Sequence, residues 1–332
     1  MTGDRARAAR AASPLVVAID APSVDLTDRD RLASAFPSVS FVAATDPDDL
    51  AQAITRAHVV FGKRLPHAAI AGAPTLAWVQ AGTAGVDGVL ARGPWPDGVL
   101  LTNARGAHGT PISEQVVAMM LAFATRLHVL LRAQAERRNV ARAVTSTKWE
   151  LSGQRLVILG LGDIGGSLAV RASALGMRVT GVRREPAPVP GCERVVGPGS
   201  LVEVLRDADH LAACLPLTPG TRHLVGEAEL RALPRGAHVY NVGRGAVIDG
   251  QALRRALADG HLGGAGLDCV EPSDIPDVSD PLWSHPDVIL GQHSSGHAPG
   301  NSRLITDIFA SNLERFLAGR ELENRVDLAR GY

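Results

Sequence analysis

Short apolar segments alternate with amphipathic segments along the first third of the chain. The apolar segments predict buried strands at 15–20, 39–45, 58–64 and 75–82. Apolar positions at helical spacing predict helices over 26–36, with Thr27 as N-cap, and over 46–55, with acidic residues in its first turn. Strands that alternate with helices in this way predict a parallel sheet covered by helices.

A long apolar segment follows this block. No Gly or Pro interrupts the chain from Ile112 to about Arg138, and apolar side chains would occupy most faces of the helix that this segment predicts. Such a helix must be buried on several sides. We therefore expect it to cross between domains or to pack against a second subunit, with Met119 and Met120 as core residues.

Strand–helix alternation resumes at Arg155. Apolar segments predict strands at 155–160, 177–182, 210–216, 237–242, 263–268 and 287–291, with helices at 163–175, 200–206, 226–232 and 249–259. Continuous apolar runs fit strands that are covered on both faces, so the pattern predicts one doubly wound parallel sheet. After Pro299, a helical segment at 302–319 is expected to pack back onto the first domain. The predicted organisation is thus an α/β protein of two domains, 1–108 with 299–332, and 109–298.

Composition excludes several classes of protein. The length of 332 residues suits about two domains. Lys plus Arg and Asp plus Glu both number 34, so the formal net charge is zero, which argues against a nucleic-acid or membrane-surface partner. Cys192, Cys214 and Cys269 show no CxxC spacing, which favours a reducing interior and neither disulfides nor a metal site.

The chain shows no targeting or membrane signal. No stretch approaches 18 apolar residues, the minimum for a spanning helix. The amino-terminal segment MTGDRARAARAASPL lacks the apolar core of a secretory signal. We expect this segment to be a frayed tail and the protein to be cytoplasmic.

A glycine-rich turn follows the predicted strand 155–160. It reads Gly160-Leu161-Gly162-Asp163-Ile164-Gly165 and opens a predicted helix. In a dinucleotide-binding turn, the first glycine permits the tight turn, the second lets the backbone approach a pyrophosphate, and the third allows close helix–strand packing. The alternative is a strand–helix turn that needs glycine for its geometry alone. Because the motif lies within a repeated β/α block, we favour dinucleotide binding.

The end of the next strand indicates which dinucleotide is preferred. A site for NAD places Asp or Glu there to hold the ribose hydroxyls, whereas this chain has Arg183 and Arg184, and the following Glu185 precedes a proline. Two guanidinium groups would pair with a 2′-phosphate. The alternative is a pair of solvated loop arginines. We predict that NADP(H) is preferred and that NAD(H) remains possible.

Polar residues follow three further strands of the second block. Arg244 lies in Asn241-Val242-Gly243-Arg244-Gly245, Asp268 ends Gly266-Leu267-Asp268, and His293 begins a short polar run after the last strand. Ligands bind at the carboxyl edge of such sheets. Any one of these residues could be structural, but the three together beside a dinucleotide site predict an active site.

At these residues the sequence resembles the D-isomer-specific 2-hydroxyacid dehydrogenases. The resemblance runs from about Leu76 to Pro299 and is strongest in LVILGLGDIGGSLA, CLPLTPGTRHLVG, YNVGRGAVIDGQALRRALADGHLGGAGLD and DPLWSHPDVILGQHSSG. The ending NRVDLARGY resembles members close to glyoxylate/hydroxypyruvate reductases. The resemblance implies two Rossmann-like or flavodoxin-like domains with parallel sheets and a cleft between them, and a homodimer formed through the long helix.

The resemblance also implies roles for individual residues. Arg244 would hold the carboxylate and carbonyl of a 2-oxo acid, and His293 would be the acid/base. The segment WVQAGTAGVD resembles the family's substrate-carboxylate loop, with backbone N–H groups around Ala81, Gly82 and Thr83. The implied cofactor-binding residues are Gly160, Gly162, Asp163, Ile164, Gly165, Arg183, Arg184, Leu215, Pro216, Thr221, Val242, Gly243, Asp268 and Ser295.

One position departs from the family pattern. The family has a catalytic Glu five positions after the strand-end Asp, where this chain has Ser273. A loop one residue longer would bring Asp274 into that place, and Glu271 is the other carboxylate available. We favour Asp274. Without a carboxylate beside it, His293 would not have a raised pKa and reduction would weaken at neutral pH.

These observations favour an NADPH-dependent reductase of small 2-oxo acids such as glyoxylate or hydroxypyruvate. Hydride from nicotinamide, a proton from a histidine and a cation for the carboxylate are what that reduction needs. Two alternatives remain. One is a nucleotide-sensing protein on the same scaffold, which the departure at Ser273 favours. The other is a dehydrogenase of another small anion, such as formate or phosphite, because the same arginine would bind it.

Overall fold

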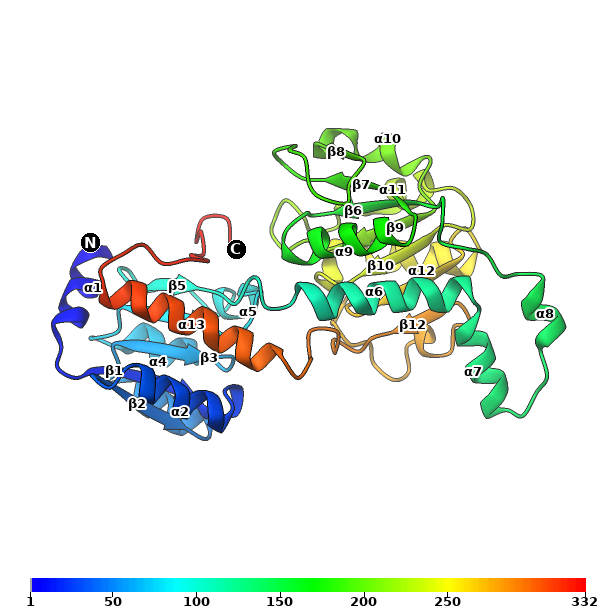
Figure 1. Ribbon diagram of the computed structural model, residues 1–332. Helices are drawn as coiled ribbons and strands as arrows, with labels where there is room; N and C mark the ends of the chain where they lie inside the picture. Colours follow the sequence, from blue (N-terminus) through cyan, green and yellow to red (C-terminus); the bar gives the residue numbers. More distant parts are fainter. Residues whose placement is uncertain (1) are drawn as a thin grey trace. The chain divides into compact units, whose positions relative to one another are not determined.

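The computed structural model describes residues 2–332 and divides them into two compact units (Figure 1). Unit 1 contains the chain up to His108 together with Ala298–Tyr332, and unit 2 contains Gly109–His297. Each unit is an α/β fold built around its own parallel sheet. The two units are described separately.

Unit 1 has a five-stranded sheet in the order β2-β1-β3-β4-β5, with every neighbouring pair parallel. Its strands are β1 (Leu15–Asp20), β2 (Val39–Ala44), β3 (Val59–Gly62), β4 (Trp78–Ala81) and β5 (Leu100–Thr102). Its helices are α1 (Thr2–Ala11), α2 (Leu26–Ala35), α3 (Pro47–Ile54), α4 (His67–Gly72), α5 (Asp87–Leu90) and α13 (Asn301–Leu317).

Unit 2 has a seven-stranded parallel sheet in the order β12-β11-β10-β9-β6-β7-β8. Its strands are β6 (Arg155–Leu159), β7 (Arg178–Val182), β8 (Arg194–Val196), β9 (His210–Ala213), β10 (His238–Asn241), β11 (Gly264–Leu267) and β12 (Val288–Leu290). Its helices are α6 (Gly109–Ala124), α7 (Leu127–Ala135), α8 (Ala141–Thr145), α9 (Asp163–Ala174), α10 (Leu201–Leu205), α11 (Glu227–Ala232) and α12 (Gly250–Ala258). The strand order reverses beside β6, and ligands bind at the carboxyl ends of the strands at such a point in sheets of this kind.

The last helix, α13, belongs to unit 1 and packs on its sheet through aromatic side chains. Phe309 stacks on Phe61 with ring centroids 4.3 Å apart and on Trp78 at 5.4 Å, and Phe316 stacks on Trp78 at 5.5 Å. All four rings are fully buried. This is the packing that the apolar positions at 302–319 predict.

The amino-terminal segment is a helix, so the expectation of a frayed tail is wrong. Ala6 and Ala9 of α1 are buried, and Arg5 Nη1 donates to the carbonyl of Leu76 at 3.1 Å. Alanine favours helix formation, and these small side chains let α1 pack closely on unit 1. The N-cap of α2 is likewise corrected, because that helix begins at Leu26 after Asp25 and Thr27 lies inside it.

The long helix expected over 112–138 is two helices, α6 and α7, bent by 73°. The bend lies at Arg126, which has a left-handed backbone with φ of 58°. The N–H of Trp149 donates to the carbonyl of Ala124 at 3.1 Å, and Arg126 Nε donates to the carbonyl of Thr147 at 3.1 Å. These tertiary contacts end α6 where the local sequence would continue it.

Met119 and Met120 are buried in α6, as predicted. Within residues 2–332, no single helix has the length and apolar composition to cross a membrane. The bent pair α6 and α7 reaches that composition only when the two are taken together, and most of the apolar side chains of α6 belong to the core of unit 2.

Candidate active site

The turn between β6 and α9 gives each of its three glycines a different constraint. Gly160 has φ of +87°, a conformation that residues with a side chain rarely adopt. A Cβ on Gly165 would lie 1.9 Å from the carbonyl oxygen of Gly160, so only glycine permits this approach of α9 to the strand end. A Cβ on Gly162 would meet no protein atom within 4 Å. Open space in front of Gly162, at the amino end of α9, is what a pyrophosphate requires.

Other residues implied in cofactor binding follow the neighbouring strands. Leu215 and Pro216 come after β9, and Val242 and Gly243 come after β10. A Cβ on Gly243 would lie 2.4 Å from the carbonyl oxygen of Leu215, so the two segments touch. Thr221 Oγ1 donates to the carbonyl of Pro216 at 2.6 Å and closes the loop that follows β9. These segments lie with the glycine turn at the carboxyl edge of the sheet.

Arg183 and Arg184 directly follow β7. The N–H of Arg183 donates to the carbonyl of Val196 at 3.0 Å, which fixes the backbone at the strand end. Arg183 is half-buried, whereas Arg184 and the next residue, Glu185, are exposed. The position that carries an acid in an NAD site is therefore occupied by arginine.

Asn241, at the end of β10, holds the turn that carries Arg244. Its Nδ2 donates to the carbonyl of Arg244 at 3.0 Å, and its Oδ1 accepts from the N–H of Gly243 at 3.3 Å. The Arg244 Nη1 donates to the carbonyl of Gly243 at 2.9 Å. The side-chain amide of Asn241 thus provides hydrogen bonds to the backbone groups of Gly243 and Arg244 within the turn. The sequence analysis did not identify this function, although a buried Asn at a strand end is a signal for it.

Asp268, at the end of β11, holds the loop that carries His293. Only 2% of Asp268 is exposed. Its Oδ1 accepts from the N–H groups of Ser294 and Ser295 at 3.1 and 3.3 Å, and its Oδ2 accepts from the Ser295 hydroxyl. Its carbonyl accepts from the N–H of His293 at 2.8 Å. Gln292 and His293 have left-handed backbones, with φ of 56° and 53°. Residues with a side chain rarely adopt this conformation, so the contacts with Asp268 must stabilise it.

His293 contacts Asp274 directly. The imidazole Nδ1 lies 3.2 Å from Asp274 Oδ2, and Asp274 Oδ1 accepts from the N–H of Gly245 at 3.2 Å. The hydrogen bond that His293 donates to Asp274, with the negative charges of Asp274 and Asp268, raises the pKa of His293 against the opposing effects of burial and of the Arg244 charge. The hydrogen bond from His293 correspondingly lowers the pKa of Asp274. The pair therefore favours a protonated imidazole beside an ionised carboxylate.

The other carboxylate available, Glu271, lies elsewhere. Glu271 accepts from His223 Nε2 at 2.7 and 2.9 Å and pairs with Arg222 at 3.5 Å. The hydroxyl of Ser273, at the position where the family has Glu, donates to the carbonyl of Ile275 at 2.6 Å. Of the two carboxylates that the sequence offered, Asp274 is the one that contacts His293.

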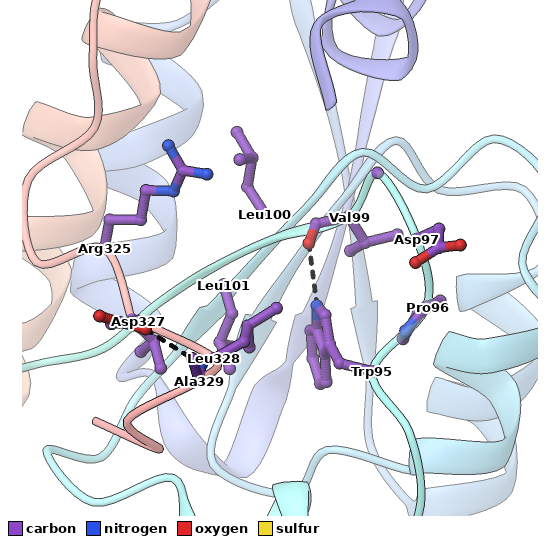
Figure 2. A pocket seen from close by; sticks show the side chains of 12 residues that line it. Trp95, Pro96, Asp97, Val99, Leu100, Leu101, Arg325, Asp327, Leu328 and Ala329 are labelled. Carbon is purple, nitrogen blue, oxygen red and sulfur yellow. Dashed lines mark hydrogen bonds between the residues drawn. The ribbon is translucent and has the colours of Figure 1, made fainter. Parts of the chain in front are cut away.

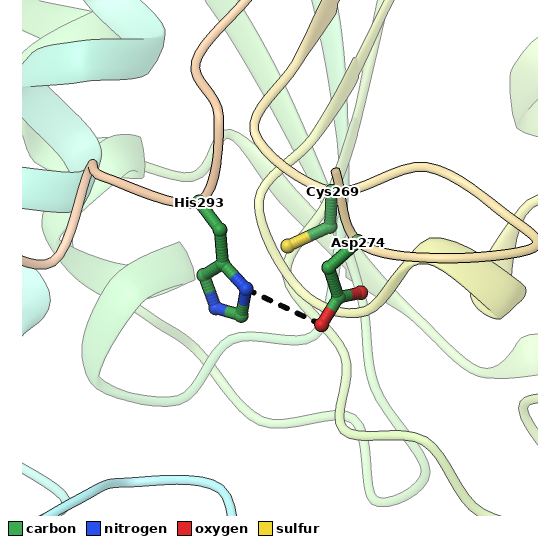
Figure 3. A group of neighbouring side chains, drawn as sticks. All are labelled: Cys269, Asp274 and His293. Atoms are coloured by element: carbon green, nitrogen blue, oxygen red, sulfur yellow. Dashed lines mark ion pairs between the residues drawn. The ribbon is translucent and has the colours of Figure 1, made fainter. Parts of the chain in front are cut away.

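Cys269 lies close to the same pair (Figure 3). One ligand atom from each of Cys269, Asp274 and His293 falls within 4.8 Å of the others, a spacing that a cation such as Zn²⁺ could bridge. The Cys269 thiol donates to the carbonyl of Gly243 at 3.8 Å. The positive charge of Arg244 acts on both His293 and Asp274 and opposes the addition of a divalent cation.

In unit 1, the predicted carboxylate loop follows β4. The N–H of Gly82 donates to the carbonyl of Gly62 at 2.8 Å, so it is not available to a substrate, and Ala81 is a buried strand residue. The next N–H groups, of Thr83, Ala84 and Gly85, have no acceptor among residues 2–332. Of the expected residues 81–83, only Thr83 therefore has a backbone N–H without a protein acceptor, and the N–H groups of Ala84 and Gly85 share this property.

A pocket of unit 1 is separate from this loop (Figure 2). It measures about 540 Å³ and is lined by residues 95–101 and 325–329, including Trp95, whose Nε1 donates to the carbonyl of Val99 at 2.9 Å. None of the predicted site residues lines it.

Comparison with known proteins places the chain in a family. Residues 117–295 match the model of the D-isomer specific 2-hydroxyacid dehydrogenase, NAD binding domain. The chain is 37% identical over 268 residues to an uncharacterised protein of Streptomyces coelicolor, covering 80% of this chain and 93% of that protein. It is 31% identical over 271 residues to a glyoxylate reductase of Korarchaeum cryptofilum, covering 77% of each. This chain belongs to the D-isomer-specific 2-hydroxyacid dehydrogenase family.

A solved structure supports the same assignment over nearly the whole chain. A D-isomer specific 2-hydroxyacid dehydrogenase of Xanthobacter autotrophicus, in complex with NADPH and MES, is 30% identical, with a TM-score of 0.83 and coverage of 97% of this chain and 100% of that one. As a member of the family, the chain is an enzyme that uses a nicotinamide cofactor and acts on small 2-hydroxy or 2-oxo acids.

The glycine turn between β6 and α9 allows cofactor binding to be tested separately from folding. Gly162→Ala should melt within about 2 °C of the unmodified enzyme, because the added Cβ meets no protein atom. The variant should nevertheless bind the cofactor about tenfold or more weakly, because the Cβ occupies the space in front of the helix amino end. The control is Gly166→Ala, which also meets no protein atom but lies within α9 and should retain binding. Thermal melts and fluorescence titration with NADPH measure both. Undiminished NADPH binding in Gly162→Ala would contradict this assignment.

Proposed function

We propose that this dehydrogenase reduces a small 2-oxo acid, such as glyoxylate or hydroxypyruvate, to the D-2-hydroxy acid. The observation that carries the proposal is the His293–Asp274 pair, with Nδ1 and Oδ2 3.2 Å apart and the charge of Arg244 acting on both groups. The pair supplies an acid and the arginine supplies a cation for an α-oxo carboxylate.

His293 would act as the acid through its Nε2. Because Nδ1 faces Asp274, the ring is oriented with the other nitrogen available to a substrate oxygen. The raised pKa favours the charged imidazole, the form that can donate the proton that the developing alkoxide requires. In the reverse direction the neutral ring accepts that proton. Asp274 stabilises the charged ring without taking the proton.

Arg244 would hold the carboxylate and the reacting carbonyl of the substrate. Its backbone is fixed by Asn241, so the guanidinium extends from a rigid turn. Arginine matches a carboxylate with two parallel donors. In unit 1, the N–H groups of Thr83, Ala84 and Gly85 have no acceptor among residues 2–332, and successive free N–H groups of this kind can bind an anion. They would bind the substrate carboxylate.

The residues around the glycine turn fit a nicotinamide dinucleotide, with the pyrophosphate at Gly162 and the adenosine end at Arg183 and Arg184. The bound cofactor supplies the hydride for the reduction. NADP(H) is the preferred form in this proposal, and the NADPH complex of the Xanthobacter relative supports it. A nucleotide-sensing role is less favoured, because Asp274 supplies the carboxylate that seemed absent at Ser273.

Replacing Asp274 tests whether this carboxylate raises the pKa of His293. Asp274→Asn removes the negative charge that raises the pKa of His293, so the imidazole loses its proton at lower pH. Reductive activity of the variant should therefore fall at lower pH than that of the unmodified enzyme. The factor by which its kcat/KM falls below that of the unmodified enzyme should be about fivefold or more larger at pH 8 than at pH 6. The measurement is kcat/KM for glyoxylate from pH 5 to 9.

A matched variant separates this effect from damage to the fold. Ser273→Ala alters the adjacent residue, whose hydroxyl contacts only Ile275 among the described residues, and should keep the pH profile. His293→Ala should lose most turnover at every pH while retaining NADPH binding. Identical pH profiles for Asp274→Asn and the unmodified enzyme would refute the role of Asp274.

The two arginines after β7 predict a cofactor preference. NADPH should bind at least about tenfold more tightly than NADH, because one charge-assisted hydrogen bond to a phosphate contributes about 1.5–3 kcal/mol. Arg183→Asp or Arg184→Asp should move the preference toward NADH. Isothermal titration with each cofactor measures it. Equal or tighter binding of NADH by the unmodified enzyme would show the assignment to be wrong.

We also propose that the enzyme is a homodimer with twofold symmetry. Leu121, Leu127 and Leu131 of α6 and α7 are exposed by 39, 47 and 57% in the single chain, and burial of such side chains favours association. A dimer mass is expected from light scattering at micromolar concentration. Leu127→Glu with Leu131→Glu should shift it toward a monomer. A monomer mass for the unmodified chain would contradict the proposal.

A further inference from the structure

The side chain of Glu271 joins the loop that follows β11 (the β11 loop, residues 269–280) to two neighbouring segments of unit 2. Its carboxylate oxygens lie 2.9 and 2.7 Å from His223 Nε2, and Arg222 Nη1 lies 3.5 Å from Oε1. Its Oε2 also accepts from the N–H of Gly250, the first residue of α12, at 3.3 Å. One carboxylate of the β11 loop therefore binds both the loop after β9 and the start of α12.

The backbone at Glu271 is packed between two glycines. A Cβ on Gly245 would lie 2.6 Å from the carbonyl carbon of Val270 and 2.9 Å from the nitrogen of Glu271. A Cβ on Gly250 would lie 2.8 Å from the carbonyl oxygen of Glu271, so only glycine permits these approaches. Arg254 Nη1 donates to the same carbonyl oxygen at 3.1 Å. This segment is therefore held on two sides as well as through its side chain.

Asp274 lies three residues further along the β11 loop. The N–H of Val270 donates to the carbonyl of Asp274 at 3.3 Å, so the loop closes on itself between these two residues. Asp274 Oδ1 accepts from the N–H of Gly245, and Oδ2 faces His293 Nδ1, both at 3.2 Å. Because so short a segment separates Glu271 from Asp274, the position of the Asp274 carboxylate depends on where Glu271 is held.

Little packing holds this part of the loop otherwise. Pro272, Ser273 and Ile275, the neighbours of Asp274, are exposed. Loop segments with few buried side chains open easily, so the polar contacts of Glu271 are needed to fix the segment. The charged and titratable groups around Glu271 are Arg222, His223, Arg254 and, through its effect on His223, Asp249.

The partners of Glu271 on the other side lie in the loop after β9 (the β9 loop), to which cofactor binding is assigned above. Arg222 and His223 directly follow Thr221, whose hydroxyl closes that loop. His223 has a left-handed backbone with φ of 51°, a conformation that surrounding contacts must stabilise. The contact between His223 and Glu271 therefore connects the β9 loop directly with the β11 loop.

We propose that Glu271 is a positioning residue that ties the β9 loop to the β11 loop and so holds Asp274 against His293. This role rests on the proposed function, because Asp274 and the β9 loop have the functions given there. Within residues 2–332, Glu271 forms no hydrogen bond or ion pair with His293, so it acts on the acid through Asp274. Removal of Glu271 should therefore change both the acid and the affinity for the cofactor.

Glu271→Ala tests both ends of this connection. The pH at which reductive kcat/KM for glyoxylate falls should move lower, as in Asp274→Asn, because a displaced Asp274 carboxylate no longer raises the pKa of His293. NADPH should bind about threefold or more weakly in a fluorescence titration, whereas Asp274→Asn should keep the affinity of the unmodified enzyme. Unchanged NADPH binding in Glu271→Ala would overturn the connection to the β9 loop.

A double variant separates positioning from direct electrostatics. In Asp274→Asn the carboxylate that acts on His293 is already lost, so adding Glu271→Ala should leave the pH profile of that variant unchanged. A further shift as large as that of Glu271→Ala alone would show that the charge of Glu271 acts on His293 through space, and the proposal would fail. The other charged or titratable groups near His293, unaltered in every variant, are Asp268, Cys269 and Arg244.

Glu227→Ala is the matched control. Glu227, the first residue of α11, forms ion pairs with Arg231 and Arg255, each at 2.8 Å, so its loss removes a comparable set of contacts outside the β11 loop. Its pH profile and NADPH affinity should equal those of the unmodified enzyme. If Glu227→Ala shifts the profile as much as Glu271→Ala does, general destabilisation explains the effect and the proposal is overturned.

A readout without turnover keeps this result distinct from the proposed reaction. In ¹⁵N-labelled enzyme, the imidazole of His293 should titrate at lower pH in Glu271→Ala than in the unmodified enzyme, and Asp274→Asn should titrate alike with and without Glu271→Ala. If no 2-oxo acid is reduced but these differences are found, the proposed reaction fails and the role of Glu271 stands.

A second variant approaches the same contact from the β9 loop. His223→Asn removes the imidazole that contacts Glu271, and asparagine tolerates the left-handed backbone at this position. It should shift the titration of His293 in the same direction as Glu271→Ala, and it decides the outcome if Glu271→Ala does not fold. An unchanged titration of His293 in a folded Glu271→Ala, or in His223→Asn when it alone folds, would overturn the proposal.

Discussion

The carboxylate of Asp274 connects three segments that the chain brings to the carboxyl edge of the unit 2 sheet. Asp274 lies in the loop after β11, its Oδ1 accepts from Gly245 in the turn after β10, and its Oδ2 meets His293 in the loop after β12. One side chain therefore positions the acid and braces the turn that carries Arg244. The same charge raises the pKa of the imidazole, so the position of His293 and its pKa both depend on this one ion pair.

Buried carboxylates at strand ends recur as anchors in both units. Asp268 accepts from two N–H groups and a hydroxyl of the loop with His293, and Asp20 accepts from the turn with Lys63 and Arg64. In each case a carboxylate with little exposure is stabilised by several donors, because an unpaired buried charge would cost far more. The loops that follow the strands gain fixed positions without becoming part of the sheet. Rigid loops of this kind are what catalysis requires of side chains that must hold a proton or an anion in place.

Local signals allowed much of this architecture to be predicted from the sequence. The strand–glycine turn–helix unit of β6 and α9 depends on apolar residues and glycines that are adjacent in the chain, and the packing of α13 depends on aromatic residues at helical spacing. The break between α6 and α7 was missed because the N–H of Trp149 and the carbonyl of Thr147, both distant in sequence, determine it. The strands β5 and β8 are only three residues long and carry too little pattern to be recognised. Helix α1 was missed because its buried face consists of alanines.

The active-site residues divide in the same way. Arg244, Asp268 and His293 follow apolar strands directly, so their place at the sheet edge could be predicted. The sequence favoured Asp274 as the partner of His293 but left Glu271 open, because the path of the loop 269–280 depends on contacts of Glu271 with His223 and of Arg254 with Asp280. In unit 1, the motif could not show that the N–H of Gly82 is already bonded to the carbonyl of Gly62.

Whether Asp274 favours the charged form of His293 can be measured by a nuclear magnetic resonance titration of that imidazole. Uniformly ¹⁵N-labelled enzyme would be titrated from pH 5 to 9, with the His293 signals assigned by their loss in His293→Gln. The pKa of His293 should lie above the ordinary value of 6.5, and Asp274→Asn should lower it. A pKa of His293 at or below 6.5 in the unmodified enzyme, unchanged in Asp274→Asn, would show that Asp274 does not stabilise the charged imidazole.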